Sequence, residues 1–373
     1  MKKLLLATFA LALLAPVAKA EINLDLGGYF KGYAGYADQD VAGTRDVDFK
    51  RKAQVFFLGE TTLDNGLTVG YNGQLIQDST VDPAGGDDAK VEQSYLYFSG
   101  NWGRMNLGRE NGAAYLLQVS APGADANLDG QDITFSFFNQ GTANIRQDYG
   151  QMGAANTTIG ALGRGEDIQY ADKVTYITPK IVGFQAGFSF APEVDAKGVS
   201  SYFGMPSDAD AGGYENLIEA GVRYDGEFSG LGIHAGGGYS AANLEAPLFG
   251  FGEDLKEFNL GGKLTYEGFG FGVAYNNRDG GINAGGLGNV DTWVAGLDYT
   301  YGSYNFGGSY LKSTGDSLLG GEDEYDRVAV GAGYTYGPGM KFNGSVGLHD
   351  LTAATAALDN KATVVSIGTD VQF

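Results

Sequence analysis

Two histidines, His234 and His349, are the only imidazole side chains in this chain, and imidazole is the usual general base near neutral pH. His349 shares a predicted strand face with Ser345, but four strand residues separate the two by about 13 Å. A Ser–His pair needs hydrogen-bond contact, so His349 cannot activate this serine. The chain has no cysteine, which excludes disulfides and Cys-ligated metals. The sequence therefore predicts that the protein is not an enzyme.

The remaining candidates for chemistry are charged side chains of two kinds. Basic residues occur in segments that alternate like strands, and carboxylates occur in one long polar stretch. If such segments line a water-filled pore, opposite charges on two sides of its narrowest part select the ions that pass. Water is displaced there and no longer weakens the field of each charge. The basic candidates are Lys31, Lys50, Lys52, Arg109 and Lys173, and the acidic candidates are Asp125, Asp129 and Asp132.

Carboxylates outnumber basic side chains by 45 to 24, which gives a formal net charge of −21. Such a chain repels nucleic acid and attracts cations. Ca²⁺ binds carboxylate oxygens, but none of the acidic clusters has the spacing of an EF-hand loop. The clusters are Asp38/Asp40, Asp87/Asp88, Asp208/Asp210, Glu253/Asp254 and Glu322/Asp323/Glu324/Asp326. We expect no cofactor, with structural Ca²⁺ at these predicted loops as the alternative.

The first twenty residues have the pattern of a cleaved export signal. Lys2 and Lys3 precede an apolar run over residues 4–17, and Ala18-Lys19-Ala20 matches an A-x-A cleavage site. The apolar run is shorter than the ~20 residues of a membrane-spanning helix. We expect a signal peptide over residues 1–20 and a mature chain over residues 21–373. Loss of three lysines with the signal changes the formal net charge from −21 to −24.

The last segment of the chain, residues 362–373, alternates with a period of two. Val365, Ile367, Val371 and Phe373 share one parity, and mostly polar residues take the other. A strand with one face in lipid and one in water has this pattern. The same alternation is found in residues 258–267, 292–301, 327–336 and 341–349. Closure on the first strand would explain a strand that ends on an aromatic residue, because a closed barrel has no edge.

The connections between the alternating segments are of two kinds. Eight are long and acidic, and the longest covers residues 112–165. Seven are short turns in which Gly or Asn supplies positive φ, at residues 65–66, 101–103, 181–183, 229–232, 267–268, 302–303 and 337–339. Fifteen connections join sixteen strands. We therefore predict an all-β fold, a 16-stranded antiparallel transmembrane β-barrel with short periplasmic turns and long external loops.

Four segments resemble the general (non-specific) porins of Gram-negative bacteria. They are INLDLGGYFKGY (residues 22–33), FLGETTLDNGL (57–67), LGRENGAAY (107–115) and TVVSIGTDVQF (363–373). Val371 stands where a tyrosine is common in the family. The order and spacing of the four segments extend the resemblance over the whole mature chain.

The resemblance implies a homotrimer in the outer membrane, in contact with lipid and lipopolysaccharide, with a water-filled pore for small hydrophilic solutes in each barrel. It also implies that the third loop, residues 112–165, folds into the pore and narrows it. Lys31 and Arg109 match wall cations of the family's constriction, whereas Gln54 stands where enterobacterial members have arginine. The family's acidic loop signature is absent, and Ala126–Asp132 takes its place.

We expect passive diffusion with a modest preference for cations, because carboxylates exceed basic groups. The alternative is a substrate-specific channel for sugars, phosphate or organic acids on the same barrel. A third possibility is an anchoring or adhesive barrel plugged by its long loop. Trimer packing is permitted by small residues on the outward faces of the first two strands, namely Gly28, Gly32, Ala34, Ala53 and Gly59.

Overall fold

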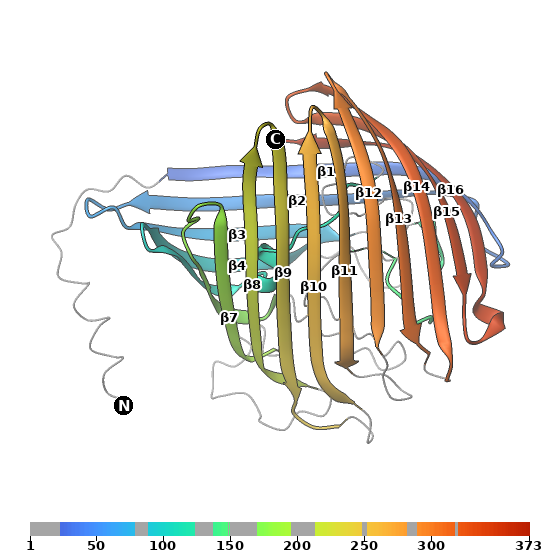
Figure 1. Ribbon diagram of the computed structural model, residues 1–373, viewed down its shortest axis with the longest axis horizontal. Helices are drawn as coiled ribbons and strands as arrows, with labels where there is room; N and C mark the ends of the chain where they lie inside the picture. Colours follow the sequence, from blue (N-terminus) through green and yellow to red (C-terminus); the bar gives the residue numbers. More distant parts are fainter. Residues whose placement is uncertain are drawn as a thin grey trace.

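The computed structural model describes residues 23–78, 89–123, 137–147, 149, 170–194, 213–247, 252–281, 289–317 and 320–373. Sixteen strands in these residues form one closed antiparallel barrel. Each strand pairs with its neighbours in sequence, and β16 pairs with β1. In Figure 1, β8 to β14 lie side by side as antiparallel neighbours, and β1 to β3 lie at a steep angle to them. The predicted fold class is confirmed.

The first eight strands are β1 (Asn23–Gln39), β2 (Val47–Thr62), β3 (Thr68–Asp78), β4 (Ala89–Gly100), β5 (Gly103–Arg109), β6 (Asp172–Ile177), β7 (Phe184–Glu193) and β8 (Tyr214–Phe228). The other eight are β9 (Leu231–Leu244), β10 (Glu253–Tyr266), β11 (Phe269–Gly281), β12 (Val290–Tyr301), β13 (Tyr304–Asp316), β14 (Glu322–Gly337), β15 (Met340–Thr352) and β16 (Asn360–Gln372). The described residues also include the short helices α2 (Ala113–Leu116) and η4 (Ala356–Leu358).

Alternation of side chains along each strand gives the barrel an apolar outer face and a polar inner face. In β10, Leu260 is 65% exposed on the outside, whereas its neighbours Glu257 and Asn259 are buried on the inside. In β12, Leu297 is exposed and Thr292 is buried. Exposed aliphatic side chains over a whole wall are unfavourable in water and favourable in a lipid bilayer. Among the described residues, no helix is long and apolar enough to cross a membrane.

All seven predicted short turns join consecutive strands in the structure. Three of them place two successive residues at positive φ: Val182-Gly183, Ser229-Gly230 and Glu267-Gly268. Positive φ at both central positions matches the right-handed twist of the strands that the turn connects. The short connections therefore lie at one end of the barrel, and the long connections lie at the other.

Several strands extend further toward the long-loop end than the sequence indicated. Glu322, Glu324 and Asp326 were expected in a loop, but they belong to β14, and Glu253 begins β10. Part of the reason is cross-strand charge pairing, because Lys312 Nζ on β13 lies 3.1 Å from the Glu324 carboxylate. Two further predictions, the signal peptide (residues 1–20) and the acidic candidates Asp125, Asp129 and Asp132, lie outside the described residues.

The C-terminus is bound to the first strand. Gly28 N donates to Phe373 O (2.9 Å), and Phe373 N donates to Gly28 O (3.0 Å). A Cβ atom at Gly28 would lie 2.9 Å from the Phe373 ring, so glycine at this position leaves room for the terminal aromatic side chain. The chain therefore ends on an aromatic residue that fits against β1 and completes the closure.

Candidate functional site

Part of the longest connection, residues 110–123, lies along the inside of the barrel wall. Inward-facing glycines on six consecutive strands leave room for its backbone or, at Gly187, for the side chains of Ala113 and Leu117. A Cβ atom at Gly261 would lie 1.8 Å from Val119 O, and one at Gly296 would lie 1.9 Å from Pro122 O. We call these glycines the glycine track: Gly187 (β7), Gly221 (β8), Gly236 and Gly238 (β9), Gly261 (β10), Gly272 (β11) and Gly296 (β12). Only a residue without a side chain permits this approach, so the track determines the path of the loop.

A second part of the same connection, residues 137–147, lies against the inner face of β13 to β16. Arg146 N donates to Ser313 Oγ (2.8 Å). Arg327, which is 0% exposed, donates from Nη1 to Gln147 O (2.9 Å). Hydrogen bonds between a buried charged side chain and a backbone carbonyl hold a loop in one place. The described parts of the loop thus line the wall from β7 to β16.

The wall formed by β1 and β2 carries the predicted lysine pair. Lys31 and Lys52 are register partners, so their side chains project from the same face. This face is the inner one, because Tyr33 and Gly35 share its parity and Gly35 contacts Phe137 of the loop. Lys31 Nζ lies 5.8 Å from the centre of the Tyr29 ring. Neither lysine forms an ion pair with a described residue.

Lys50 lies on the same inner face as Lys31, opposite Tyr33 in the register. Its ammonium group forms an ion pair of 2.8 Å with Asp48. The structure therefore brings Lys31, Lys50 and Lys52 together on adjacent strands, and it leaves two of the three without a carboxylate partner among the described residues.

The other two basic candidates lie apart from these lysines. Lys173 faces inward from β6 but is buried in an ion pair of 2.9 Å with Glu219, with side-chain exposures of 0% and 1%. Arg109 lies opposite Ser94 and Asp172 in the strand register, and its guanidinium lies 5.9 Å from the Tyr170 ring centre. The structure does not bring Lys173 or Arg109 to the surface that carries Lys31.

A basic residue that the sequence analysis did not single out also faces the interior. Arg104 on β5 lies over the Tyr97 ring, 3.8 Å from its centre, and its Nε donates to Asn106 Oδ1 (2.7 Å). The alternation of Arg104 and Asn106 with Met105 and Leu107 is the signal that could have identified it. The Gln54 amide, at the position where enterobacterial members of the family have arginine, donates to Glu92.

Both histidines are engaged in structural contacts. His349 Nδ1 and the Tyr325 hydroxyl are 2.8 Å apart, and Phe138 of the loop stacks on the His349 ring with centres 4.9 Å apart. His234 Nδ1 is hydrogen-bonded to Asp225 (2.8 Å). In the part of the chain that the structure describes, no group of three or more acidic or histidine side chains is arranged to hold a metal ion.

These features define a class of protein. A closed barrel with an apolar outer face, a polar and charged inner face and a long loop along its inner wall is an outer-membrane channel. The chain matches the family of Gram-negative porins over residues 7–354, so it belongs to that family. It is therefore a porin, a channel for passive diffusion through the outer membrane of a Gram-negative bacterium, and it is not an enzyme.

Solved structures of porins share the fold of this chain at low sequence identity. An anion-selective porin from Comamonas acidovorans is 18% identical, with 95% of this chain and 100% of that chain covered and a TM-score of 0.66. Salmonella typhi OmpF, in complex with daunomycin, is 16% identical, with 94% of this chain and 97% of that chain covered and a TM-score of 0.63. OmpT of Vibrio cholerae, in its trimer form, is 15% identical, with 94% of this chain and 99% of that chain covered and a TM-score of 0.61. None of the curated proteins matches the sequence.

Proposed function

We propose that this porin is non-specific and modestly cation-preferring. The proposal is supported by ion pairs that neutralise several of its interior cations. Lys50 lies against Asp48, Lys173 against Glu219, and Arg146 against Glu257 at 2.6 Å. Paired cations contribute little to the field in the pore, so the carboxylate excess of the chain dominates. Lys31 and Lys52 form the basic side of the constriction, and Asp125, Asp129 and Asp132 form its acidic side.

The reversal potential across a lipid bilayer under a salt gradient tests this preference. With KCl at low concentration, the sign should correspond to K⁺ passing more readily than Cl⁻, and the preference should weaken as salt screens the charges. A reversal potential of the opposite sign would refute the preference for cations. A large ohmic conductance with no solute-specific block separates a non-specific pore from a substrate-specific one.

Reversing the charges of the lysine pair should strengthen the cation preference. In K31E/K52E, each reversal makes a cation at ~8 Å more stable by about 1 kcal/mol even in bulk water. We expect the K⁺/Cl⁻ permeability ratio to rise several-fold at low salt. The matched control is K312E/K361E, which makes the same change in net charge on the outward face of β13 and β16. An unchanged ratio in K31E/K52E would place both lysines away from the constriction.

The proposed assembly is a homotrimer in contact with lipid and lipopolysaccharide. It is supported by a hollow of about 1040 Å³ on the outward face where β1 and β2 adjoin β13 to β16. The hollow is floored by small residues, including Gly32, Ala34 and Gly344, and rimmed by Phe30, Phe49 and Phe306. Small residues at an interface within a membrane let neighbouring chains approach closely. Side chains of a second copy fit such a surface. Lipopolysaccharide is the proposed neighbour at the long-loop end.

Filling this hollow should weaken the trimer without unfolding the barrel. A34F places a ring in the hollow, whereas A220F places the same ring on the outward face of β8, away from the hollow. Native mass spectrometry in detergent should give trimers for the wild type and A220F, and mainly monomers for A34F. Equal trimer fractions in both variants would exclude this surface as the interface.

A further inference from the structure

A cavity of about 440 Å³ lies inside the barrel, between α2 and the inner face of β4 to β7. It belongs to the short-turn half of the channel, because Gly103, Thr178 and Pro179 line it next to the short turns. Its volume is within the ~300–1,000 Å³ range of small-molecule sites. Neither passive diffusion nor the lysine pair on β1 and β2 accounts for it.

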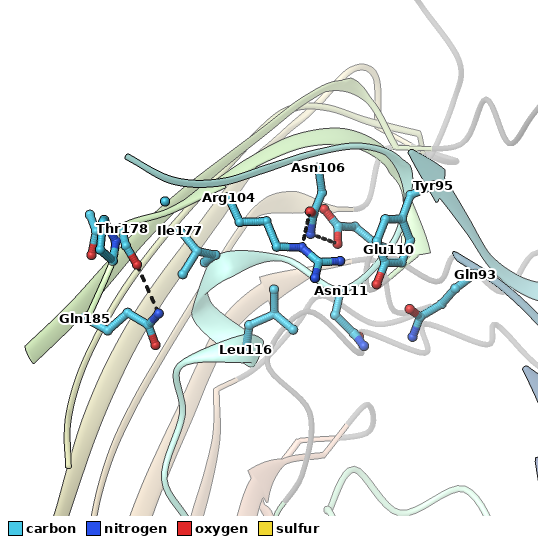
Figure 2. A pocket seen from close by; sticks show the side chains of 12 residues that line it. Gln93, Tyr95, Arg104, Asn106, Glu110, Asn111, Leu116, Ile177, Thr178 and Gln185 are labelled. Atoms are coloured by element: carbon cyan, nitrogen blue, oxygen red, sulfur yellow. Dashed lines mark hydrogen bonds between the residues drawn. The ribbon is translucent and has the colours of Figure 1, made fainter. Parts of the chain in front are cut away.

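Two side chains of opposite charge line this cavity, and a single amide links them. Arg104 Nε donates to Asn106 Oδ1 (2.7 Å), and Asn106 Nδ2 donates to Glu110 Oε2 (2.6 Å). Figure 2 shows the guanidinium of Arg104 among the side chains of Asn106, Glu110 and Asn111. Because one amide lies between the guanidinium and the carboxyl group, one small molecule can contact both.

The two carboxyl oxygens of Glu110 differ in their hydrogen bonding, because Asn106 donates to Oε2 alone. The residue is 2% exposed, and its Oε1 atom has no hydrogen-bond partner among the described residues. Burial of a carboxyl oxygen without a donor is unfavourable, so a ligand that brings a donor to this carboxyl group is favoured there. The rest of the lining combines amides (Gln93, Gln185) with the apolar side chains of Leu116 and Ile177.

We propose that this cavity is a binding subsite for a small zwitterion, an aliphatic α-amino acid. The carboxylate of the ligand pairs with Arg104, its ammonium group pairs with the Glu110 carboxylate, and its side chain packs against Leu116 and Ile177. Recognition of both charges distinguishes an amino acid from a simple carboxylate or amine. The subsite concentrates such solutes beside the diffusion path, and its loss leaves the conductance of the pore intact.

Ligand analogues test the proposal on the wild-type protein. Leucine carries both charges, leucinamide lacks the carboxylate, and N-acetylleucine lacks the ammonium group. Binding to the purified trimer in non-ionic detergent is measured by calorimetry or by ligand-detected NMR. Leucine should bind at least tenfold more tightly than either analogue, since each charge-assisted hydrogen bond is worth ~1.5–3 kcal/mol. Affinities equal within twofold, or no binding of leucine, would overturn the proposal.

Two variants assign the charges to residues. R104Q should remove the preference for leucine over leucinamide, and E110Q should remove the preference for leucine over N-acetylleucine. The matched control is K263Q, which removes an interior cation from β10 outside the cavity and should bind leucine like the wild type. If both preferences persist in R104Q and E110Q, the subsite does not lie in this cavity.

The protonation state of Glu110 provides an independent readout. Burial raises the pKa of the Glu110 carboxyl from 4.5 to about 7, against the opposing effects of the Asn106 amide, the Thr175 hydroxyl and the positive charges of Lys173 and Arg104. Among the described residues, the titratable side chain that lines the cavity besides Arg104 and Glu110 is Tyr95 on β4. Leucine stays zwitterionic between about pH 6 and pH 8, so its affinity should rise over this window as Glu110 loses its proton. The rise should be absent in E110Q, and a rise that persists there would contradict the assignment.

Discussion

Replacing Gly261 with alanine should lower the single-channel conductance and destabilise the loop. The new Cβ atom would lie 1.8 Å from Val119 O, whereas ordinary contact begins at 3.4 Å. The loop backbone must therefore move by about 1.6 Å, and the wall behind it leaves only one direction, toward the axis of the pore. Overpacking of this kind typically costs about 1–3 kcal/mol. A narrower passage conducts fewer ions, which single-channel recording in a lipid bilayer measures directly.

The adjacent residue is the matched control. Gly262 faces outward from the same strand, and a Cβ atom there would meet only His234 O, at 3.7 Å. G262A adds the same methyl group and the same change in backbone entropy, so its conductance and thermal stability should stay close to those of the wild type. If G261A conducts like G262A, the loop is not held against the wall by the glycine track. A conductance that rises in G261A would show that the loop leaves the pore.

The strands and turns of this barrel could be predicted because their signals are local. Alternation at a period of two depends only on which face meets lipid, and a tight turn depends on residues such as Gly66 and Gly268 that adopt positive φ. Alternation alone does not decide which face of β4 points inward, because Tyr95, Leu96, Tyr97 and Phe98 place large side chains on both faces. The structure resolves it: Tyr97 is buried inside and donates to Glu60, whereas Leu96 is exposed outside.

The site was less predictable, because the sequence of one strand does not show which charged side chains on other strands lie next to its own. Parity predicts an inward position for Lys31, and in the structure both Lys31 and Lys173 face inward. Only the fold shows that Lys31 has no carboxylate partner among the described residues, whereas Lys173 meets Glu219, 46 positions away in sequence. The route of the loop was equally hidden, since the seven track glycines are distributed among 62 in the chain.

Removing the ammonium group of Lys173 should produce the largest loss of stability. In K173M the Glu219 carboxylate would remain buried without its cation, and among the described residues it would keep a hydrogen bond of 3.3 Å from Ser240 Oγ. Breaking a buried ion pair by removing one partner typically costs about 3–5 kcal/mol. The loss is measured as the change in the midpoint and free energy of denaturant unfolding in detergent micelles. Because Lys173 lies under α2, the start of the loop should loosen as well.

A double variant separates the cost of the lone charge from the value of the pair. K173M/E219Q has no buried charge at this position, and replacing a buried ion pair by uncharged side chains of similar volume is often close to neutral. It should therefore be more stable than K173M alone. K180M is the exposed counterpart, because Lys180 also pairs with a carboxylate, Asp225, at 2.7 Å, but is 49% exposed. Its loss should be at most about 1 kcal/mol. Equal losses in K173M and K180M would mean that water reaches Glu219, and the loop would then not seal this part of the wall.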